Sequence, residues 1–143
     1  MLKFMKIFLF CTVLFGVNLN AASDNFIKKY GYEVDYDTAL EKAKSSNKQI
    51  MMVLSTKSCP WCRKFERQTL KKTMINDIVD KDFIPVALDK NNDFYPDKFA
   101  TKIVPTTFFI NPKDESVESV IYGYKNKRVF KGILLEAIED YEE

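Results

Sequence analysis

Hydrophobic and polar positions along the chain form blocks that predict a mixture of helices and strands. Strand-like blocks are apolar throughout or alternate apolar with polar residues, whereas helix-like blocks space their apolar residues three and four apart. The predicted strands are residues 49–55, 82–89, 104–110 and 116–122. The predicted helices are residues 38–46, 59–70, 74–79 and 130–141, with a short helix or turn over 94–103. This order predicts an α/β sandwich with a mixed sheet, whose last two strands form a hairpin.

The segment before these blocks has no clear period. Residues 23–34 carry Phe26, Tyr30 and Tyr32 at irregular spacing. We expect an extended arm that lays these aromatic rings on the core.

Single residues refine the predicted elements. Residues 35–38 supply candidates for the N-cap of the first helix, and Thr38 with Glu41 fits a capping box there. Pro85 cannot donate to a β-ladder, which predicts the beginning of a strand or an edge strand. Met51 and Met52 are adjacent in a predicted strand and therefore point to opposite faces, so we interpret them as core residues and not as shared metal ligands.

The first 22 residues have the three parts of a secretory signal peptide. A short positive segment is followed by an apolar run over residues 7–17, and Ala21 and Ala22 are small. The run is shorter than the roughly 20 residues that span a bilayer. We expect cleavage near Ala21 or Ala22, which leaves a domain over residues 23–143 in the periplasm or outside the cell. An uncleaved membrane anchor is the alternative, and Cys11 belongs to the leader in either case.

Composition predicts one domain with its own core. The chain has 143 residues, 46% of them hydrophobic, and no histidine. Its net charge of +2 includes Lys3 and Lys6 of the leader, so the remaining chain is balanced and gives no argument for nucleic acid or an anionic membrane as partner. The lack of histidine removes the usual general base and the commonest metal ligand.

The strongest chemical signal is Cys59-Pro60-Trp61-Cys62, placed where a buried strand turns into a helix. At that position Cys59 falls at the N-cap, where unpaired backbone N–H groups and the helix dipole favour the thiolate, which is the attacking species. Pro60 suits the first helical turn. Cys62 lies about one turn deeper and can resolve a mixed disulfide.

Two other interpretations of this cysteine pair remain open. A zinc site needs about four ligands, and Cys11 of the leader is the only further cysteine, so we expect no metal and no other cofactor. A static structural disulfide is the second alternative, although two intervening residues at a helix start are more typical of redox-active pairs.

Two motifs together resemble the thioredoxin-like superfamily over roughly residues 35–141. One is the Cys59–Cys62 motif after a buried strand, and the other is Val104-Pro105-Thr106 at the head of a β-branched, aromatic strand. The resemblance, closest to the secreted bacterial branch, implies a thioredoxin-like fold with a mixed central sheet flanked by helices on both faces. It also implies thiol–disulfide exchange with protein thiols or disulfides.

The resemblance further implies a role for each motif residue. Cys59 would be the exposed nucleophile and Cys62 the resolving thiol. Pro105 would be a cis-proline that holds its loop against the sulfurs, and the backbone of Val104 would pair with a substrate segment as an added strand. Pro60 and Trp61 would tune the potential, and Trp61 would also present an aromatic surface.

The chain also departs from thioredoxin. Val53 stands where thioredoxin has a buried aspartate that assists proton transfer at the resolving thiol. Glu66, through water, or Lys57, as a charge partner, could substitute, although a solvated salt bridge is the simpler role for either.

The resemblance favours a reductase over an oxidase, because oxidases of the Dsb type usually carry a large helical insertion that forms the substrate groove, and the stretch between the two motifs is too short for one. Such a reductase receives electrons from a membrane or soluble redox partner. The alternative function is a non-catalytic binding or chaperone module with an inert disulfide. The sequence leaves the substrate, the electron donor, the oligomeric state and the potential open.

Overall fold

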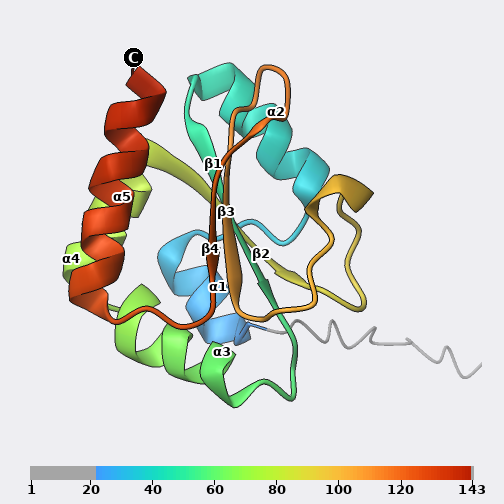
Figure 1. Ribbon diagram of the computed structural model, residues 1–143, viewed down its shortest axis with the longest axis vertical. Helices are drawn as coiled ribbons and strands as arrows, with labels where there is room; N and C mark the ends of the chain where they lie inside the picture. The colour runs from blue at the N-terminus through green and yellow to red at the C-terminus, as the bar shows by residue number, and fades with distance from the viewer. Residues whose placement is uncertain (1–21, 143) are drawn as a thin grey trace, which may run out of the picture.

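A mixed four-stranded sheet forms the centre of the molecule (Figure 1). The computed structural model describes residues 22–142, so nearly all of the predicted leader, with Cys11, lies outside the described residues. The strands are β1 Gln49–Ser55, β2 Phe83–Asp89, β3 Thr106–Ile110 and β4 Val117–Tyr122. Their order is β2-β1-β3-β4, with β1 parallel to β2 and antiparallel to β3, and β3 antiparallel to β4. The predicted mixed sheet and hairpin are confirmed.

Helices cover both faces of this sheet, as predicted. One face packs against α2 Tyr36–Ser46 and the 3-10 turn η2 Asp97–Phe99. The other face packs against the remaining helical elements: α1 Asp24–Tyr30, α3 Pro60–Phe65, the π-helical turn η1 Glu66–Leu70, α4 Thr73–Asp82 and α5 Lys127–Glu142. None of the helices in residues 22–142 is long and apolar enough to span a membrane.

Strand β1 is buried on both sides because helices lie on both faces. Met51 packs in the cluster that contains Phe130 of α5, and Met52 packs in the cluster that contains Tyr36 of α2. The two methionines therefore point to opposite faces and serve the core, as the strand period predicts. This central strand ends at Ser55 and delivers the chain to the cysteine motif.

Strand β2 is an edge strand, which agrees with the position predicted for Pro85. Glu33 lies along its outer side: the Glu33 N–H donates to the Pro85 carbonyl at 2.8 Å, and the Ala87 N–H donates to the Glu33 carbonyl at 2.9 Å. Pro85 takes part in this bridge through its carbonyl, so its lack of an N–H costs the bridge no hydrogen bond.

The predicted extended arm is wrong, because the segment begins with helix α1. The Ser23 carbonyl accepts the first helical hydrogen bonds, from Phe26 and Ile27, and Gly31 ends the helix in the left-handed conformation at φ 66°. Seven residues are too few for a helical period to stand out in the sequence. The expected function of the aromatic residues is nonetheless fulfilled, since Phe26 is buried with its ring 4.5 Å from that of Tyr32.

Other predicted boundaries need smaller corrections. Helix α2 begins at Tyr36, and its N-cap is Asp35, whose carboxylate accepts from the Thr38 N–H at 2.8 Å and the Thr38 hydroxyl at 2.7 Å. The Thr38 capping box is therefore wrong, since Asp35 already caps the same turn. Within residues 94–103 only η2 is helical.

Candidate functional site

The cysteine pair lies where the chain leaves β1 and enters α3. Cys59 is the N-cap of α3, and its sulfur accepts a hydrogen bond from the Cys62 N–H at 3.0 Å. Pro60 occupies the first helical turn. The sulfur of Cys59 thus lies among the backbone N–H groups at the helix start, an environment that stabilises negative charge on sulfur.

The two cysteines form a disulfide, with Cα atoms 5.2 Å apart. Both residues are largely buried, Cys59 at 8% and Cys62 at 7% exposure. In this oxidised form Cys59 is therefore not exposed, in contrast to what the resemblance implies. Cys62, Phe65 and Thr69 share the buried face of the motif helix, as their spacing predicts.

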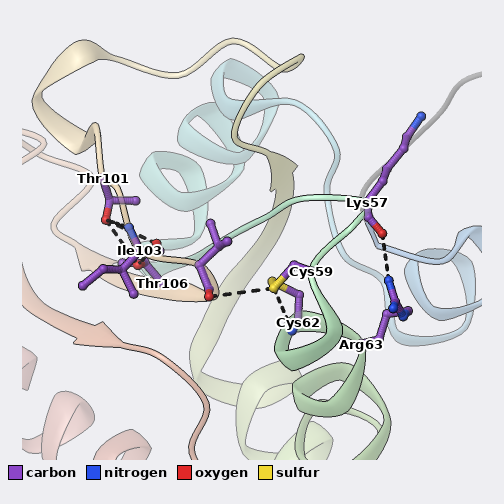
Figure 2. The surroundings of a disulfide bond; sticks show 8 residues. Lys57, Cys59, Cys62, Arg63, Thr101, Ile103 and Thr106 are labelled. Carbon is purple, nitrogen blue, oxygen red and sulfur yellow. Dashed lines mark hydrogen bonds between the residues drawn. A yellow bond between two sulfur atoms is a disulfide. The ribbon is translucent and has the colours of Figure 1, made fainter.

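The second motif lies against the first (Figure 2). The Val104–Pro105 peptide bond is cis, and the Val104 carbonyl oxygen lies 3.8 Å from the Cys59 sulfur. The two motifs meet because the end of β1 and the start of β3 fall at the same edge of the sheet, where Leu54 pairs with Thr106.

Threonine hydroxyls hold this loop in place, a role that the sequence analysis missed. The Thr106 hydroxyl donates to the Ile103 carbonyl at 2.6 Å, and the Ile103 N–H donates to the Thr101 hydroxyl at 3.2 Å (Figure 2). From the other side, the Gly123 N–H donates to the Pro105 carbonyl at 2.8 Å. The sequence signal for this role is a threonine on each side of the Val104-Pro105 pair, at positions 101 and 106.

Glu66 is the first residue of the π-helical turn η1, which directly follows α3. Its carboxylate accepts from the Ser23 N–H at 3.1 Å and the Ser23 hydroxyl at 2.6 Å, and pairs with the Lys71 ammonium at 2.8 Å. Glu66 also lines a cavity of about 10 Å³, together with Cys62 and Val53. That volume is close to the minimum for one water. Glu66 is thus both an ion-pair partner and a neighbour of the resolving cysteine.

Lys57 has a different position. Its carbonyl accepts a hydrogen bond from the Arg63 guanidinium at 2.9 Å, while its ammonium points away from the disulfide (Figure 2). Of the two residues, Glu66 and not Lys57 shares a cavity with Cys62.

An aromatic surface flanks the disulfide on the side of β4. The Trp61 side chain is 55% exposed, and its ring lies 5.8 Å from that of Tyr124. The Lys64 ammonium lies 4.7 Å from the centre of the Trp61 ring and 4.9 Å from that of Tyr124. Trp61, Val104, Gly123 and Tyr124 together line a shallow hollow of about 380 Å³. The cysteine motif points to Trp61, whereas no local pattern in the sequence distinguishes Tyr124.

Tyr32 is a buried phenol whose pKa is affected by its burial and by Glu66. Burial, and secondarily the Glu66 carboxylate, raise the pKa of Tyr32 far above its ordinary value, so this phenol stays neutral. Across residues 22–142, no three histidine, cysteine, aspartate or glutamate side chains converge as a metal site would require.

Comparison with protein families and with curated proteins gives one match. A family model described as a thioredoxin-like domain matches residues 36–138. No curated protein matches the chain.

Solved structures share the fold at low sequence identity. A thioredoxin from Thermus thermophilus is 17% identical with a TM-score of 0.64, over 73% of this chain and 85% of that one. A structure titled DsbH oxidoreductase is 16% identical with a TM-score of 0.63, over 75% and 83%. The periplasmic thioredoxin SoxS from Paracoccus pantotrophus is 13% identical with a TM-score of 0.52, over 65% and 98%.

Proposed function

The chain belongs to the thioredoxin-like domain family, and from this membership we propose that it is a thiol–disulfide oxidoreductase for protein disulfides outside the cytoplasm. One observation carries the proposal: the Cys59–Cys62 pair lies at a helix start, directly against the Val104–Pro105 loop. A purely structural disulfide needs neither an N-cap position nor a neighbouring surface open to partners. The leader predicted for residues 1–22 supports action outside the cytoplasm.

The proposed reaction moves two electrons from the dithiol to a substrate disulfide. The Cys59 thiolate attacks one substrate sulfur, which forms a mixed disulfide and releases the other substrate sulfur as a thiolate. The Cys62 thiolate then attacks the Cys59 sulfur, which releases the second substrate thiolate and forms the Cys59–Cys62 disulfide. The proton from the Cys62 thiol would pass to Glu66 through a water. A dithiol partner regenerates the reduced form.

Val104 is the proposed docking point for the substrate backbone. Among residues 22–142 no group accepts a hydrogen bond from its N–H, and its carbonyl faces the Cys59 sulfur. An extended substrate segment that pairs with Val104 as an added strand would bring its own sulfur to Cys59. The hollow lined by Trp61 and Tyr124 would take a neighbouring side chain of the substrate.

We propose the reductase direction. Between Cys62 and Val104 the described chain forms only α3, η1, α4, β2 and η2, without a helical insertion to enclose a substrate. The likeness to two proteins titled thioredoxin supports the same direction. Val53 in place of a buried acid and the helix start at Cys59 argue for the opposite direction, because both favour the Cys59 thiolate and so a more oxidising pair. We give the missing insertion more weight than these two features.

Reduction of insulin disulfides tests the activity. With dithiothreitol as electron source, the wild-type protein should accelerate insulin precipitation, and Cys59→Ser should remove the acceleration. Cys62→Ser should instead accumulate a mixed disulfide between Cys59 and insulin, visible by mass spectrometry. No acceleration by the wild-type protein, together with no adduct from Cys62→Ser, would support an inert binding module. The mass of the exported chain, from cells fractionated into compartments, tests cleavage near Ala21 or Ala22.

A further inference from the structure

Charged side chains are distributed unevenly between the two ends of the molecule, although the chain without its leader is balanced. Three segments surround the disulfide: residues 55–71, 101–106 and 122–131. They are joined by three contacts: Val104 with Cys59, the Gly123 N–H with the Pro105 carbonyl, and the Trp61 ring with the Tyr124 ring. We call these segments the basic end.

Basic residues dominate the basic end. The only acidic residue in the three segments is Glu66, and its carboxylate is already occupied by Lys71 and Ser23. The basic residues are Lys57, Arg63, Lys64, Arg67, Lys71, Lys102, Lys125, Lys127, Arg128 and Lys131. Within the described part of the chain, Lys71 is the only one of these that forms an ion pair. Within these three segments basic residues therefore outnumber acidic ones; Asp89 and Asp93, at the end of β2 beside Ser55, are the neighbouring acidic residues.

Helix stability does not explain this distribution. Helix α5 begins at the basic end with Lys127 and Arg128, and it has no acidic residue in its first turn and no basic residue in its last. It ends at the opposite end of the molecule, where its final residues include Asp140 and Glu142 (Figure 1). The helix dipole favours the reverse arrangement, with acidic residues first and basic residues last. The charges on α5 are thus unfavourable to its helix dipole, and helix stability does not account for the basic residues at its start.

We propose that the basic end is the docking surface for an acidic protein partner, whose cysteine is flanked by aspartate or glutamate residues. This inference rests on the proposed function, since the partner cysteine exchanges with Cys59. The apolar hollow between Trp61 and Tyr124 lies within the basic end, and the Lys64 ammonium lies over both rings. A partner segment with apolar and acidic residues next to its cysteine fits both features. A membrane would meet the charge but supplies no sulfur for the disulfide.

Three synthetic peptides test the proposal with the purified protein. Each carries one cysteine linked to 2-thiopyridine as a mixed disulfide, flanked by two glutamates, two serines or two lysines. Release of the thiopyridine by the reduced protein is followed by absorbance. Rates with dithiothreitol alone correct for the intrinsic reactivity of each peptide. Measurements are made at about 0.01 M salt, where charges act over about 30 Å, and at about 1 M, where they act over about 3 Å.

We expect the glutamate peptide to react about tenfold faster than the serine peptide at low salt, and the lysine peptide to react more slowly than both. High salt should remove these differences. The double variant Lys102→Glu with Arg128→Glu should lose the preference and keep the rate with the serine peptide. Both side chains are exposed and neither contacts the disulfide. Glutamate at position 128 is favourable to the helix dipole at the start of α5, so we expect the double variant to fold.

The matched control is Lys44→Glu with Lys113→Glu, which changes the net charge equally at exposed positions away from the basic end. It should keep the preference for the glutamate peptide. Equal corrected rates with all three peptides would overturn this inference and leave the proposed function intact, as would equal loss of preference in both double variants. Failure to release thiopyridine from any peptide would overturn the proposed function and this inference with it.

Discussion

Replacing Glu66 with glutamine should slow the resolution of the mixed disulfide about tenfold and leave the first attack by Cys59 unchanged. Glu66 lines the small cavity that also borders Cys62, and no other acidic residue lines that cavity. A positioned base contributes roughly 10²–10⁴-fold to a proton transfer. We expect the effect to fall below this range, because Glu66 acts through a water and its charge is partly neutralised by Lys71 at 2.8 Å. Tenfold corresponds to about 1.4 kcal/mol of activation free energy.

The assay separates the two chemical steps by their spectroscopic signals. The chain has one tryptophan, Trp61, next to the disulfide, so its fluorescence reports the state of the pair in stopped-flow experiments. Acid quenching and mass spectrometry identify the mixed disulfide and give its rate of decay. Glutamine at position 66 can still accept the hydrogen bond from Ser23, which preserves the contact with α1.

Two controls distinguish proton transfer from packing. Lys71→Gln removes the ion pair but keeps the carboxylate, and it should not slow resolution. In Glu66→Gln the deficit should shrink above pH about 8.5, where an ordinary thiol ionises without help from a base. Resolution at the wild-type rate near neutral pH, or a deficit that persists equally at alkaline pH, would refute a role for Glu66 in proton transfer.

Two further predictions concern stability. Phe130→Ala should lower the free energy of unfolding by about 3–5 kcal/mol in urea titrations, because this fully buried ring packs edge-on 5.1 Å from that of Phe65; the exposed Leu135→Ala on the same helix is the control and should change it little. Asp35→Ala should cost about 1 kcal/mol through loss of the N-cap, and Asp35→Asn much less. The hydrogen bonds from Thr38 lower the pKa of Asp35 below its ordinary value of 3.8, so its stabilisation is complete above that pH and is lost as the pH falls through the lowered pKa. The stability difference between wild-type protein and Asp35→Ala should therefore shrink in acid, and a difference that stays constant with pH would contradict the capping role.

Much of the site follows from sequence because its elements are local. Cys59 at the N-cap, Pro60 in the first turn and the buried face shared by Cys62 and Phe65 are set by one strand-to-helix transition. To predict that the Val104–Pro105 pair lies next to Cys59, the family resemblance was needed as well. The sequence pattern alone does not specify which strands are neighbours.

The features that sequence missed depend on contacts between distant segments. Ser23 binds Glu66 and Tyr124 lies near Trp61, and neither pairing leaves a periodic signal in the chain. The predicted single helix over residues 59–70 changes to a π-helical turn at Glu66, where packing against α5 and the hydrogen bond from Thr69 to Lys125 override local helical preference.

The equilibrium reduction potential of the Cys59–Cys62 pair, measured against glutathione on residues 23–143, tests the proposed function most directly. A reductase predicts a value near −270 mV, roughly that of thioredoxin. A value near −120 mV, roughly that of the strong oxidant DsbA, would contradict the proposed direction of electron flow. A pair that does not equilibrate with glutathione would contradict the proposal of an exchanging disulfide altogether.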